Sequence, residues 1–124
     1  MKKELSVDEI IAKHIEYDRI IEENLYGGDY KKNNRAVKNL NKLIFTYKDN
    51  ETIASQVYDQ LLSHSNRMVR ANAAVECLRI GIFEEESLKI LEDLAAGQGM
   101  LSFSCGMCLK LWRGEIKGKN FERY

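Results

Sequence analysis

Apolar residues recur every three or four positions along most of the chain, which is the spacing that places them on one side of an α-helix. The first such stretch begins after Ser6 and Glu9, which have the spacing of a capping box, and it ends at Gly27 and Gly28. We therefore expect a helix from Val7 to about residue 25. Its inward side would be formed by Val7, Ile10, Ile11, His14, Tyr17, Ile21 and Leu25.

Five further helices are expected from the same pattern, near residues 30–47, 51–63, 67–80, 84–96 and 100–113. In the second of them the apolar side would include Ala36, Val37, Leu40, Leu43, Ile44 and Tyr47. The chain has no proline, and no alternating run of Val, Ile and Thr indicates a strand. We expect an all-α fold, a short solenoid of six helices in three antiparallel pairs. It would form a single domain over residues 1–114, followed by a polar tail over residues 115–124.

One stretch of the fourth expected helix carries a recognisable pattern, Val69-Arg70-Ala71-Asn72-Ala73-Ala74 followed by Leu78. It resembles the second helix of a HEAT-type repeat, whose pattern is Val-Arg-x-x-Ala-Ala-x-x-x-Leu. The small alanines would let a neighbouring helix come close. In HEAT repeats the matching arginine typically reaches a turn between repeats, so the resemblance implies that role for Arg70 and a HEAT-like solenoid.

A second resemblance lies in the C-terminal stretch Gly97-x-Gly99-x-Leu101-x-Phe103-Ser104-x-x-Met107-x-Leu109-x-x-Trp112-x-x-Glu115. It resembles the signature of a small bacterial family of short HEAT-like proteins, known as domain of unknown function two thousand and nineteen. This chain has Cys105-Gly106 where the family has a small residue and then an acidic one. Together the two resemblances cover about residues 60–115. They imply no catalytic residues, and genes of this family often look like companions in bacterial toxin and immunity clusters.

The charge balance limits the classes of partner. Lys plus Arg is 19 and Asp plus Glu is 19, so no net charge attracts nucleic acid or an anionic membrane, and a charge-driven partner needs a local patch. No apolar run approaches the roughly 20 residues that span a bilayer, and the start does not read as a signal peptide. With three cysteines, an odd number, we expect free thiols and a cytoplasmic location.

Cys105 and Cys108 form a C-x-x-C motif, which raises the question of redox or metal chemistry. On a helix both thiols share a face with Leu101, Leu109 and Trp112, so small buried residues are the favoured interpretation. A redox site would need a strand before the helix, and a structural zinc site needs four ligands. Neither is indicated, and no catalytic, cofactor-binding or metal-binding residue is predicted. A redox enzyme remains a third alternative, which a thiol pKa near or above ~8.5 would oppose.

Lys31, Arg35, Lys38 and Lys42 form one basic stripe on the second expected helix. A solvated face is the simplest interpretation of such a stripe. In solenoids of helix pairs, however, the second helix of each pair lines the concave surface. That rule predicts a partner-binding strip on the second, fourth and sixth helices, formed by Lys31, Arg35, Lys38, Lys42, Asn72, Val75, Glu76, Arg79, Met107, Lys110 and Leu111.

These expectations favour a non-catalytic protein-binding module, in particular an immunity-type protein that neutralises a toxin by occlusion in the cytoplasm. The strip suits a protein partner with acidic groups, with the chain acting as a monomer or weak dimer and without a membrane. The alternative is a small nucleic-acid-binding protein related to HEAT-like DNA glycosylases, which would use the basic stripe. Neutral net charge and the lack of aromatic residues beside those lysines oppose that alternative.

Overall fold

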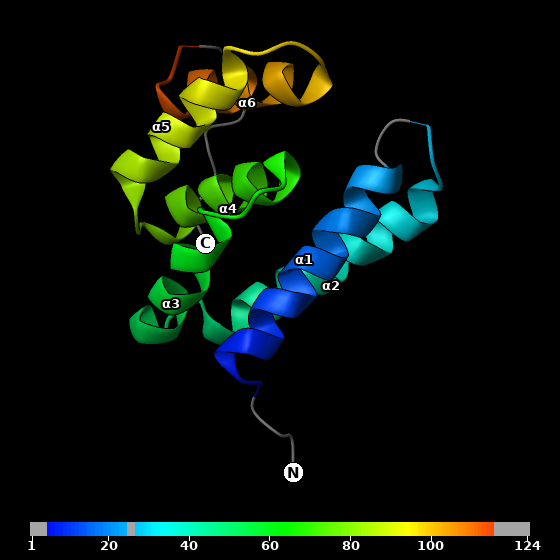
Figure 1. Cartoon of the computed structure of the whole chain (residues 1–124), viewed down its shortest axis with the longest axis vertical. Coiled ribbons are helices and arrows are strands. Elements are labelled where there is room, and N and C mark those ends of the chain that lie inside the picture. The colour runs from blue at the N-terminus through cyan, green and yellow to red at the C-terminus, as the bar shows by residue number, and fades with distance from the viewer. Residues whose placement is uncertain (1–4, 25–26, 116–124) are drawn as a thin grey trace. The chain divides into compact units, whose positions relative to one another are not determined.

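The computed structural model of the protein describes residues 5–24 and 27–115, and these residues form six α-helices and no strand. The all-α prediction is therefore confirmed, and the predicted helix ends agree with the structure to within two residues. The helices are α1 (Val7–Asn24), α2 (Tyr30–Tyr47), α3 (Glu51–Leu61), α4 (Arg67–Ile80), α5 (Glu84–Ala95) and α6 (Met100–Trp112) (Figure 1).

Side-chain caps explain where several helices begin. The Ser6 hydroxyl accepts a hydrogen bond from the Glu9 N–H at 3.1 Å, and a Glu9 carboxylate oxygen accepts one from the Ser6 N–H at 3.2 Å. This is the reciprocal capping box that the sequence predicted for α1. Asn50 and Asn66 start α3 and α4 in a similar way, since each side chain accepts the N–H three residues further on, at 3.1 and 3.0 Å.

The chain divides into two compact units, Met1–Leu61 and Leu62–Tyr124. In the first unit α1 packs along α2, and α3 contacts both; in the second, α5 packs against α4 and α6 (Figure 1). Two of the expected helix pairs, α1 with α2 and α5 with α6, thus pack together. The pairing of α3 with α4 would join the two units and stays a prediction, as does a single domain over residues 1–114. Of the expected tail, Glu115 is exposed, and residues 116–124 lie outside the described residues.

In the second unit α4 is buried on most of its circumference. Val69, Ala73, Ala74 and Leu78 are all buried, as the HEAT-type pattern implies. One guanidinium nitrogen of Arg70 donates to the backbone carbonyls of His64 and Ser65, both at 2.9 Å. Arg70 therefore ties α4 to the turn that precedes it. The resemblance implied a turn between repeats, whereas this turn joins the two helices that were expected to form one pair.

Candidate functional site

The most distinctive surface of the first unit is the exposed side of α2. This helix carries five basic residues and no acidic residue, and all five are exposed: Lys31, Lys32, Arg35, Lys38 and Lys42. Four of them are the predicted stripe, spaced three or four residues apart. Like charges at this spacing repel one another and destabilise a helix by a few tenths of a kcal/mol per pair. The charge repulsion within the stripe therefore does not stabilise the free protein.

Apolar side chains lie beside this stripe. Tyr30 is 68% exposed, Val37 38% and Phe45 59%. Val37 and Phe45 border a shallow depression on the helix together with Lys38, Lys42 and the amide side chains of Asn34 and Asn41. We call the outer face of α2 the surface formed by Tyr30, Asn34, Val37, Asn41 and Phe45 with the four cations of the stripe.

The outer face of α2 differs from the sequence prediction in two ways. Val37 was listed with the apolar residues of this helix, but Ala36, Leu40 and Ile44 fill the buried side and leave Val37 exposed at its margin. Tyr30 and Phe45 were missed. Phe45 follows the buried Ile44 directly, so it is turned by about 100° away from the core. The position of Phe45 directly after a core residue could have identified it in the sequence as an exposed aromatic residue.

The predicted strip on α4 is not an open surface. Glu76 is only 6% exposed, and Asn72, Val75 and Arg79 are half-buried. On α6 Lys110 is exposed, whereas Met107 and Leu111 are half-buried. The most exposed apolar residues of α6 are Met100 and Phe103, which the sequence analysis did not select. Of the predicted residues, the structure brings together the four on α2, whereas the α4 and α6 residues belong to the other unit.

A buried polar cluster joins the three helices of the first unit. The imidazole Nε2 of His14 on α1 is hydrogen-bonded to the Tyr47 hydroxyl on α2, which lies 2.8 Å from the Tyr58 hydroxyl on α3. The His14 ring packs edge-on against both tyrosine rings, with centroids 5.9 and 5.7 Å away. Burial lowers the pKa of His14 to about 4, so the ring is neutral at physiological pH. The cluster holds the unit together and has no open access for a substrate.

The C-x-x-C motif lies on the packed side of α6. Cys105 is buried, as the structural interpretation predicted, whereas Cys108 is only half-buried. Burial raises the pKa of Cys105 to about 11, and the neighbouring Cys108 adds to the shift while Arg67 opposes part of it. Burial also raises the pKa of Cys108 and of Cys77. Reactive cysteines need a lowered pKa, so these thiols are poor nucleophiles and oppose the redox alternative.

We expect slow alkylation of the folded protein as a consequence. With iodoacetamide at pH 8, Cys77 and Cys105 should react far more slowly than in urea, because burial limits both access and thiolate formation. Cys108, which is half-buried, should be modified first of the three. Mass spectrometry of tryptic peptides over time measures each rate. Rapid modification of Cys105 in the folded protein at pH 7 would show an activated thiol and contradict this reading.

Within residues 5–24 and 27–115, no three Cys, His, Asp or Glu side chains come together in a group that could hold a metal ion. Over the same ranges, no helix combines the length and apolar character needed to cross a bilayer.

Comparisons with known proteins identify no relative of this chain. No protein-family model, no curated protein and no solved structure matches this chain.

Proposed function

We propose that this protein is a non-catalytic protein-binding module, a monomer or weak dimer, that uses the outer face of α2 to bind an acidic partner. One observation carries the proposal: Val37 and Phe45 are exposed among cations that repel one another on a helix without acidic residues. A surface that combines exposed apolar groups with mutually repelling cations is typical of a site that a partner covers. An acidic partner would neutralise the stripe and bury the apolar residues in the same contact.

The partner that we propose is a toxin domain, neutralised by occlusion in the cytoplasm. Occlusion needs only a complementary surface of the usual ~1,600 Å² and no reactive group. The resemblance of residues 60–115 to the HEAT-like family supports this role. Membership of that family and stacking of the helices into a HEAT-like solenoid are part of the same proposal.

Affinity capture from the source cells with matched variants tests the proposal. The wild-type chain should capture a specific protein that elutes with added salt. The double variant with Lys38→Glu and Lys42→Glu should capture at least tenfold less of that protein. Lys89→Glu is the control, since Lys89 is an exposed lysine on α5. Co-expression of the captured protein should then be toxic alone and harmless with the wild-type chain. Equal capture by all three chains would overturn the assignment of the surface, and a captured protein without toxicity would overturn the immunity role.

A second candidate is a single-stranded nucleic acid, because the structure supplies the aromatic residues that the sequence analysis found missing. Tyr30 and Phe45 are exposed beside the basic stripe, and bases stack on such rings while cations follow the phosphates. A fluorescent oligonucleotide of about 20 deoxythymidines tests this. Binding that falls steeply between 50 and 200 mM salt and is lost in Phe45→Ala favours nucleic acid over the protein partner.

A further inference from the structure

A second hollow lies on the other flank of α2, where this helix packs against α1. It is a groove of about 420 Å³, within the range of sites that hold small ligands or side chains. Its apolar part comes from Ile20 and Ala36. Its lining is completed by Tyr17, Arg19, Glu23, Asn24, Lys32, Arg35 and Asn39.

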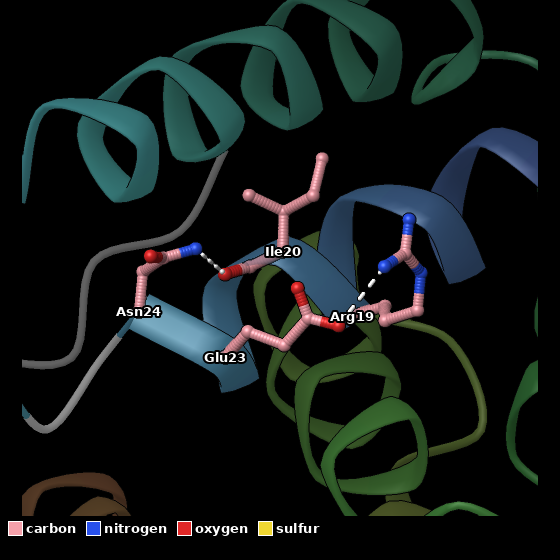
Figure 2. Close-up of polar contacts among 4 residues, drawn as sticks. All are labelled: Arg19, Ile20, Glu23 and Asn24. Atoms are coloured by element: carbon pink, nitrogen blue, oxygen red, sulfur yellow. Dashed lines mark hydrogen bonds and ion pairs between the residues drawn. The ribbon is translucent and has the colours of Figure 1, made fainter. Parts of the chain in front are cut away.

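The α1 side of this groove is held by local contacts. Figure 2 shows the Arg19 guanidinium and the Glu23 carboxylate reaching toward one another along α1, 2.9 Å apart. It also shows the Asn24 amide donating to the Ile20 carbonyl, at 2.8 Å. The Asn24 oxygen accepts the Asp29 N–H at 3.0 Å, so this side chain joins the end of α1 to the start of α2. Arg19 and Glu23 thus balance each other's charge on one wall.

The α2 side of the groove carries uncompensated positive charge. Lys32 and Arg35 lie one helical turn apart and make no ion pair with any described residue. The groove therefore has three cations against one carboxylate. Residues three apart on a helix have Cβ atoms about 5–6 Å from one another, so one carboxylate can contact both cations.

We propose that the α1–α2 groove is a carboxylate-binding site that accepts an acidic side chain, a glutamate or aspartate, of the partner. The carboxylate would bridge Lys32 and Arg35, and its methylene stem would lie against Ile20 and Ala36. A phosphate fits less well, because its second negative charge would lie close to the Glu23 carboxylate. This inference rests on the proposed function for the identity of the partner, since Arg35 belongs both to the groove and to the basic stripe.

A pair of short peptides tests the site without the partner. The probes are acetyl-Gly-Gly-Glu-Gly-Gly-amide and the same peptide with Gln in place of Glu, titrated into ¹⁵N-labelled full-length protein. The Glu peptide should shift the Asn39 side-chain amide and the Ala36 N–H in a saturable way, with about tenfold tighter binding than the Gln peptide. Lys32→Gln should remove this preference, while Lys89→Gln, the matched control on α5, should retain it.

The other possible results show whether the carboxylate site or the proposed function is wrong. Equal binding of the two peptides, or an effect that Lys32→Gln leaves unchanged, would overturn the carboxylate site. Tighter binding of inorganic phosphate than of the Glu peptide would assign the groove to phosphate and overturn it too. Phe45→Ala should leave the peptide shifts intact, because Phe45 lies outside the groove. If partner capture fails but the peptide preference holds, the proposed function fails and the carboxylate site stands.

Discussion

Replacement of Tyr58 by alanine is expected to destabilise the first unit by about 3–5 kcal/mol, which is the usual range for a buried aromatic residue. Tyr58 is fully buried, and its ring packs against His14 and Tyr47 from the other two helices of the unit. Truncation would leave a cavity where the three helices meet and remove the hydroxyl that lies 2.8 Å from Tyr47. A loss of this size is comparable to the total stability of many small domains.

Tyr58→Phe is the matched control, because it keeps the ring and removes only the hydroxyl, at an expected cost of about 1 kcal/mol. Urea unfolding followed by near-UV circular dichroism of tyrosine reports on the first unit, where five of the six tyrosines lie. Trp112 fluorescence reports on the second. Equal midpoints for the alanine and phenylalanine variants would show that the ring does not support the helix packing.

Acidification is expected to destabilise the same cluster through His14. Burial lowers the pKa of His14 from 6.5 to about 4, so the unfolded chain takes up a proton there at a higher pH than the folded one. The contribution of neutral His14 to the free energy of unfolding is therefore complete above pH 6.5 and is lost as the pH falls toward 4. The difference in pKa corresponds to about 3 kcal/mol at pH 4.

His14→Gln isolates this effect from the titration of carboxylates, because glutamine stays neutral and can still form a hydrogen bond with Tyr47. The free energy of unfolding of wild type minus that of the variant should fall by about 3 kcal/mol between pH 7 and pH 4. An NMR titration should show the His14 imidazole still neutral at pH 5. A difference between wild type and variant that does not change with pH would contradict a buried, neutral His14.

The helices were predictable because their ends depend on neighbouring residues. Ser6 and Glu9 form the capping box that the sequence indicated, Asn50 and Asn66 cap the helices that follow them in a similar way, and the absence of proline left the helices uninterrupted. Packing is different, since it depends on residues far apart in the chain. The hydrogen bond of His14 with Tyr47 joins positions 33 residues apart, and nothing local indicates it.

The candidate surface was predictable only in part, for the same reason. The basic stripe follows from the spacing of charges on a single helix, so Lys31, Arg35, Lys38 and Lys42 were found. The expectation that Glu76 faces outward rested on the rule that the second helix of each pair lines the concave surface of a solenoid, but tertiary packing covers α4 on most sides. The apolar half of the outer face of α2 was missed because an apolar residue is normally assigned to the core.

A helix that carries five cations and no anion would also affect how fast the proposed acidic partner arrives. Its field extends over about 8–10 Å in physiological salt and would draw an acidic surface toward α2 before any contact forms. Because the chain as a whole is neutral, this attraction is confined to one side of the first unit and orients the encounter as well as accelerating it. The positive charge that weakens the free helix by mutual repulsion would thus also raise the rate at which an acidic partner binds.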